Sequence, residues 1–164
     1  MRNVLPLMAL LTMAIGTAVP LIAGEPTGKL LIWVEAARDG EFVVDALEDT
    51  ANDLRGKIKG KFWEQANTRE GAHAVLLVTN RYSGDSGIRT TEYNYLGQIQ
   101  SYDAKMRVVE VQLLVGENPI KQFVGECPVT GFGGEWKAAA NQAKKAVEQF
   151  LKDNHAKILE LAAQ

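Results

Sequence analysis

The sequence predicts one α+β domain, a mixed sheet of about four to five strands with two helices packed on one face. Three observations predict it. The 164 residues suffice for one domain. Short apolar runs rich in strand-forming residues are separated by two segments with helical spacing. The strands lie far apart in sequence, which favours a mixed sheet. The predicted order is strand, helix, strand, an optional strand, two hairpin strands and helix.

The strands are predicted from apolar runs bounded by turn residues. Lys29–Glu35 and Ala72–Tyr82 read as buried strands, because their apolar residues are nearly continuous. Met106–Val115 alternates apolar and polar residues, as a strand with one buried face does, and Ile120–Pro128 returns beside it as a hairpin. Residues 88–104 fit either an outer strand or a loop.

The two helices are predicted from apolar residues recurring every three or four positions. The first covers Asp45–Lys59, with Asp45 and Glu48 marking its start; its stripe is Leu47, Ala51, Leu54 and Ile58. The second begins near Glu135 and bends or ends near Asn154. We expect the domain to span residues 25–152, and residues 153–164 to form a helical or loose tail.

The segment from Ser83 to Gly87 is predicted to be a flexible loop. It consists of serine, glycine and aspartate, which favour turns and have little tendency to form strands.

Residues 1–24 read as a signal peptide. Arg2 is followed by an uncharged apolar stretch and then by small residues, so cleavage is expected near Ala23 or Gly24. The alternative is a retained membrane anchor, but no cluster of basic residues follows the stretch. Glu25 stands where a lipoprotein would carry its cysteine. The expected product is exported, periplasmic or extracellular, without a stable membrane anchor.

Composition restricts the function classes. The net charge is -2, so no basic field exists to hold a nucleic acid. His73 and His155 have no metal-ligand spacing to each other or to Cys127, and no catalytic, cofactor or metal motif is found. Cys127, the single cysteine, is either buried or paired with another chain. The oligomeric state does not follow from the sequence.

Three elements carry a resemblance to small bacterial envelope domains. These are Asn52-Asp53-Leu54-Arg55 in the first helix, the strand Ala72–Val78, and the Trp-led helix Trp136–Lys152, which is rich in Ala and Lys. The chain resembles the amino-terminal domain of the Tol translocation beta-propeller protein, the curli secretion lipoprotein and the lipoprotein activators of peptidoglycan synthases. The resemblance implies binding and assembly in the envelope, with an envelope protein as possible partner, and carries no catalytic residues.

The best candidate contact region is rich in tyrosine. Tyrosine and arginine in a segment with many glycines are residue types that anchor interfaces, although tyrosines covering one sheet face would look the same. The candidate contact residues are Tyr82, Arg89, Tyr93, Tyr95 and Tyr102.

Two further candidates are an anion-binding turn and a carboxylate pair. Gly131, Gly133 and Gly134 precede a helix, and the free N–H groups at the start of a helix hold anions. Alternatively, the glycines serve only as a conformationally permissive connection between strand and helix. Glu110 and Glu126 face each other only in one hairpin register.

The function expected is an exported, non-enzymatic binding or assembly-accessory domain of the cell envelope. The alternatives are a small secreted enzyme or ligand-binding protein, and an exported inhibitor of another enzyme.

Overall fold

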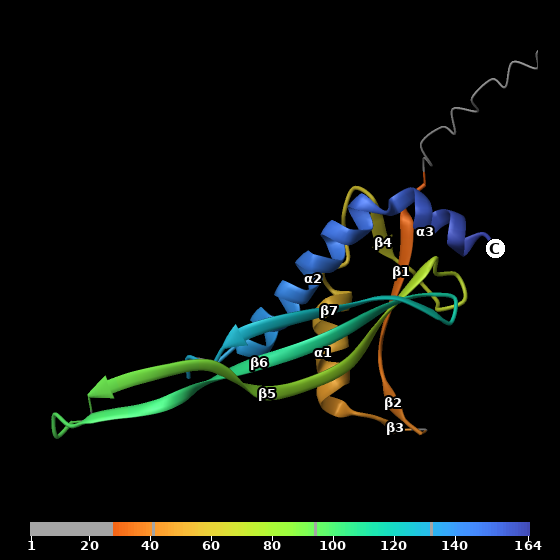
Figure 1. Cartoon of the computed structure of the whole chain (residues 1–164). Coiled ribbons are helices and arrows are strands. Elements are labelled where there is room, and N and C mark those ends of the chain that lie inside the picture. The colour runs from red at the N-terminus through yellow and green to blue at the C-terminus, as the bar shows by residue number, and fades with distance from the viewer. Residues whose placement is uncertain (1–27, 41, 94, 132) are drawn as a thin grey trace, which may run out of the picture.

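The computed structural model describes residues 28–164 except 41, 94 and 132. The signal peptide predicted within residues 1–24 lies outside the described residues. Figure 1 shows an α+β architecture in which a long sheet is backed by helices. None of the helices in the described part of the chain combines the length and hydropathy needed to cross a bilayer.

A five-stranded mixed sheet has the strand order β4-β1-β5-β6-β7. The strand β1 is parallel to both of its neighbours, whereas β5, β6 and β7 form an antiparallel meander. A separate two-stranded ladder joins β2 to β3. The strands are β1 (Leu30–Ala36), β2 (Arg38–Asp39), β3 (Phe42–Val43), β4 (Trp63–Gln65), β5 (Ala74–Tyr93), β6 (Ile99–Val115) and β7 (Asn118–Pro128).

Helices α1 (Asp45–Arg55) and α2 (Glu135–Asp153) pack on one face of the sheet, and α3 (His155–Ala162) continues the chain after a break at Asn154. One hydrophobic core joins the alternate residues of the strands to the helix stripes. The predicted stripe of the first helix is buried. Strand faces are also as predicted: Val109, Val111 and Leu113 enter the core, while Glu110 and Gln112 alternate with them on the other face.

The sheet and the helices approach each other closely at Gly125 in β7. A Cβ atom added there would lie 2.0 Å from the Ala139 carbonyl oxygen and 2.6 Å from the Ala143 nitrogen, both in the backbone of α2. Only glycine leaves room for this contact. Ala139 and Ala143 are fully buried, so small side chains on the helix match the missing side chain on the strand.

Two helix boundaries differ from the prediction. The helix α1 ends at Arg55 rather than Lys59, and Ile58 reaches the core from the segment that follows. Asp45 is the first helical residue, not the cap: Val44 occupies the cap position without a side-chain hydrogen bond. At the other end of the chain, the helical alternative for the tail is what the structure shows, with Ile158 of α3 buried in the core.

The structure contradicts the loop predicted at Ser83–Gly87. These residues belong to β5, which continues from Ala74 to Tyr93. Pairing with β6 offsets their weak strand propensity, and a bulge between Asp85 and Arg89 absorbs the irregular part. Gly87 has φ +70° within this bulge, a conformation that favours glycine. The short edge strand β4 was also missed, because three residues show no periodicity.

We expect Gly125→Ala to lower the free energy of unfolding by about 2 kcal/mol or more, since α2 must move off β7 to admit the methyl group. Urea unfolding followed by circular dichroism measures the loss. The matched control is Gly84→Ala, also in a strand, whose added Cβ would lie 3.6 Å from the Tyr82 ring and 3.8 Å from Val108. Equal stability of the two variants would contradict the close contact.

Candidate functional site

The hairpin of β5 and β6 extends beyond the rest of the sheet as a two-stranded arm. The last residue of β7, Pro128, pairs with Met106, whereas β5 and β6 remain paired as far as Tyr93 and Ile99. Figure 1 shows the arm projecting past α2, in green at the left. From Lys105 to Ile99 the arm advances roughly 20 Å, at about 3.3 Å per residue. We define the arm as residues 85–105.

The far end of the arm is apolar and uncharged. Tyr95 is 95% exposed and Tyr93 is 75% exposed, and the side chains of Leu96 and Ile99 are each 63% exposed. No charged residue occurs between Tyr93 and Tyr102. Isolated exposed apolar residues are ordinary, but here four of them lie within seven residues at the end of the hairpin. We call Tyr93, Tyr95, Leu96 and Ile99 the arm tip.

Four of the five predicted contact residues lie on the arm, but not on one face. Arg89 and Tyr93 pair with Asp103 and Ile99, on the side of the ribbon that continues the helix-covered face. Tyr102 lies on the opposite side. The hydrogen bond of its hydroxyl to Glu92, with partial desolvation, raises the pKa of Tyr102.

Tyr82 lies apart from the others, at the root of the arm. Its hydroxyl donates to Glu110 across 3.3 Å. Partial desolvation, with Glu110 beside it, raises the pKa of Tyr82. Four of the five residues grouped by the sequence analysis therefore fall on the arm, while the pairing register separates Tyr82 from the tip, where Leu96 and Ile99 also lie.

The register also places the predicted carboxylate pair. Glu110 pairs with Val124 and Glu126 pairs with Val108, so the two carboxylates are diagonal neighbours rather than directly opposed. Glu110 accepts hydrogen bonds from Tyr82 and, at 3.2 Å, from Gln122. These contacts are typical of a polar sheet surface.

The glycine turn holds a carboxylate of its own helix. The backbone N–H groups of Thr130 and Gly131 donate to Glu135 Oε1 at 3.2 and 3.0 Å, and the Thr130 hydroxyl lies 3.3 Å from the same atom. The backbone N–H of Glu135 itself, together with those of Thr130 and Gly131, lowers the pKa of the Glu135 carboxyl. A bound anion would have to displace Glu135 from the Gly131 N–H.

Beside this turn, Trp136 contacts two guanidinium groups, which sequence reasoning missed. Arg81 lies 4.2 Å and Arg107 4.9 Å from the centroid of the Trp136 ring. Arg81 also donates to the Ala46 carbonyl oxygen at 2.7 Å, which ties β5 to α1. The cluster fastens the root of the arm to both helices. Only the strand register, which sequence does not provide, brings the two arginines together.

The histidines and the cysteine have structural surroundings. His73 Nδ1 accepts the Leu31 N–H at 2.9 Å, and this extends the pairing of β1 with the segment before β5. His155 packs against Phe62 with ring centroids 5.8 Å apart. Cys127 is half-buried against the core. Among the described residues no group of three or more His, Cys, Asp or Glu side chains could hold a metal ion.

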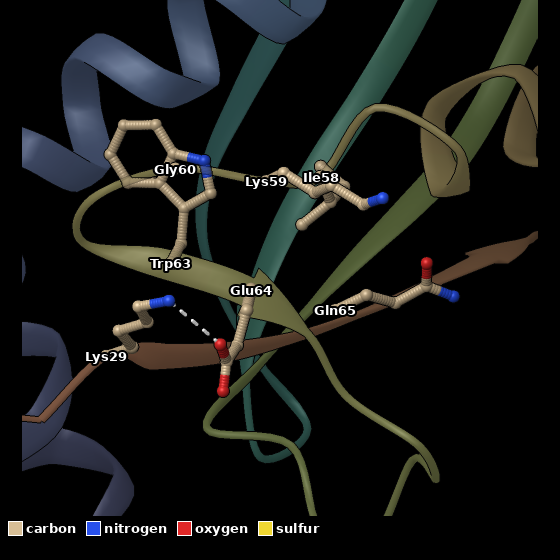
Figure 2. A pocket seen from close by; sticks show the side chains of 7 residues that line it. All are labelled: Lys29, Ile58, Lys59, Gly60, Trp63, Glu64 and Gln65. Atoms are coloured by element: carbon tan, nitrogen blue, oxygen red, sulfur yellow. Dashed lines mark hydrogen bonds and ion pairs between the residues drawn. The ribbon is translucent and has the colours of Figure 1, made fainter.

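A shallow hollow of about 400 Å³ lies beside β4 (Figure 2). Trp63, one of its lining residues, is buried, and a Cβ at Gly60 would lie 2.6 Å from the indole ring. Lys29 and Glu64 form an ion pair of 3.1 Å at its side. The hollow is lined by Lys29, Ile58, Lys59, Gly60, Trp63, Glu64 and Gln65. None of the predicted site residues lines it.

No protein-family model matches the chain, and no curated protein does. Among solved structures, the chain is similar to the crystal structure of a Xanthomonas campestris protein of family DUF330. The two are 17% identical, the match covers 85% of this chain and 89% of that chain, and the TM-score is 0.33. A likeness this distant carries no functional argument.

The environment of Glu135 predicts a pH-dependent contribution to stability. Because its folded pKa lies below the unfolded value of about 4.5, the carboxylate stabilises the fold above pH 4.5 and this stabilisation is lost as the pH falls through the folded pKa. Glu135→Gln should therefore be less stable than the native protein at pH 7, and the difference should shrink towards pH 3. Unfolding midpoints across this range measure it. Glu70→Gln, at an exposed turn position, is the control; an equal pH trend in both variants would contradict the assignment.

Proposed function

We propose that the protein is exported to the periplasm and acts there as a non-enzymatic binding or assembly-accessory domain of the cell envelope, with the arm as its contact element. The observation that carries this proposal is the arm tip: four large apolar side chains, all more than half exposed, at the end of a projecting ribbon. Covering such side chains releases water from apolar surface and favours association.

The arm has no core of its own to explain its length. Every described residue of β6 from Ile99 to Asp103 is exposed. Isolated two-stranded hairpins are marginally stable in water, and further packing usually stabilises them. A ribbon that extends past its own domain is therefore suited to complete its packing on another molecule.

The local chemistry gives less support to the enzymatic alternative. Glu110 is engaged by Tyr82 and Gln122 on the sheet surface, and the Gly131 N–H is occupied by Glu135. The two residues that a carboxylate mechanism would use are diagonal neighbours, and neither lines the hollow beside β4. An exported inhibitor would use the arm in the same way as an accessory domain does, so its partner would be an enzyme.

Photo-crosslinking in the native organism tests the contact role. A benzophenone amino acid in place of Tyr95 should give discrete adducts, because the tip is covered when bound. The same substitution at Glu117, whose side chain is 79% exposed in the turn between β6 and β7, should give few. Tyr93→Ser with Leu96→Ser should abolish binding of the isolated partner while changing the unfolding free energy by less than about 0.5 kcal/mol. Equal adducts at both positions would sink the proposal.

Export is tested separately by fractionation and amino-terminal sequencing. The mature chain should be released with the periplasm and should begin at Gly24 or Glu25. Deletion of residues 2–24 should leave it in the cytoplasm. Recovery of a chain that still begins at Met1 in the membrane fraction would instead support the retained anchor.

A further inference from the structure

The two edges of the arm differ in how well they are protected against pairing. Beyond Val78, the last residue that pairs with β1, none of the described strands pairs with the outer edge of β5. Two register shifts interrupt it, at Val78/Asn80 and at Asp85/Arg89. At the second register shift, Ser86 Oγ accepts a hydrogen bond from the Ile88 N–H at 3.0 Å. Bulges of this kind twist an edge and prevent another strand from pairing with it.

The free edge of β6 lacks such protection. The strand β7 covers β6 from Val115 to Met106, and Val129 adds one more hydrogen bond to the Lys105 carbonyl oxygen at 2.8 Å. Over Ile99–Ala104, none of the described strands pairs with β6 on that side. This stretch contains no proline or glycine, and Asp103 is its single charged residue. Natural edge strands are normally protected by the features it lacks.

The backbone groups that reach this edge can be identified. The Lys105 carbonyl points towards β7, and the direction alternates along a strand, so Ser101 and Asp103 also point their N–H and C=O groups to that side. Tyr102 and Gln100 point theirs towards β5. The open edge therefore presents two donors and two acceptors from Ser101 and Asp103, in line with the end of β7.

We infer that this edge pairs with the same edge of a second copy of the chain, antiparallel about a twofold axis near Tyr102. Ser101 would then lie opposite Asp103 of the partner subunit, and Tyr102 opposite its own counterpart. No like charges face each other directly, because the single carboxylate meets a hydroxyl. Cross-strand tyrosine pairs and hydroxyl pairs to polar groups are favourable. Pairing through backbone groups requires that another extended strand lie beside this edge. The same edge of a second copy is such a strand, and its length and charge match those of the open edge.

This inference rests on the proposed function, since it names the partner of the arm. Pairing confined to a few residues of each arm is small beside interfaces of about 1,200–2,000 Å², which hold stable complexes. The expected dissociation constant is therefore in the range of about 10 µM to 1 mM. A high local concentration in the envelope would favour the dimer.

Two proline variants separate the edges of the arm. Ser101→Pro removes an N–H that points to the free edge of β6 and leaves the ladder between β5 and β6 intact. Thr91→Pro is the matched control, because Thr91 pairs with Ser101 but points its N–H to the opposite edge of the arm. Either substitution removes the contact of 3.3 Å between the Thr91 and Ser101 hydroxyls.

Sedimentation of the mature chain from about 10 µM to 1 mM measures association. We expect the native protein and Thr91→Pro to form dimers. For Ser101→Pro we expect a dissociation constant that is larger by roughly tenfold or more. A native chain that stays monomeric at the top of this range, or equal weakening in both variants, overturns the inference.

A disulfide test does not depend on proline. In a Cys127→Ser background, Tyr102→Cys should form a covalent dimer with oxidised glutathione, because the two Cα atoms of such a pair lie about 4.5 Å apart, within the range that a disulfide spans. Thr91→Cys in the same background should remain monomeric. Absence of the Tyr102→Cys dimer overturns the twofold pairing.

The two proposals fail differently. Adducts from position 95 to a different protein, with a purified chain that stays monomeric, would keep the arm as contact element and exclude the second copy. A monomeric chain without any adduct from position 95 would exclude both.

Discussion

The contact between Gly125 and the backbone of α2 determines how the two layers of this protein meet. With no side chain on the strand and alanines on the helix, α2 lies directly on β7. Dispersion and apolar burial act over short distances, so this approach lets the small residues of α2 contribute to the core. The helix is thereby fixed over β7 and the inner half of β6, and the outer half of the hairpin is left without cover.

The root of the arm is held by a different kind of interaction. Trp136, at the start of α2, contacts both Arg81 and Arg107, one from each strand of the hairpin. Arg81 continues to the Ala46 carbonyl oxygen in α1. Both helices are therefore connected to the point at which the hairpin leaves the sheet.

The polar residues that the sequence analysis considered as site residues make hydrogen bonds within the chain. Glu135 fills part of the glycine turn, Glu110 is engaged by Tyr82 and Gln122, and His73 accepts a backbone N–H of β1. Each of these residues provides a hydrogen-bond partner to a neighbouring polar group. Polar groups in an interior or on a sheet surface are ordinarily hydrogen-bonded in this way. The arm tip differs from these sites, because its large apolar side chains are more than half exposed.

The sequence by itself determined the fold class, the apolar runs that form β1 and the first part of β5, the buried face of β6, and the stripe of α1. These follow from local periodicity, because burial selects apolar residues every second or every third to fourth position. It also indicated the tyrosine-rich segment as a contact region. It did not determine the length of the arm: Ser83–Gly87 has the composition of a loop, and only pairing with β6 makes it a strand. Nor did it place Arg81 beside Arg107 or Glu110 diagonal to Glu126. Those relations depend on register and on the bulges in β5, which are set by contacts between residues far apart in the chain.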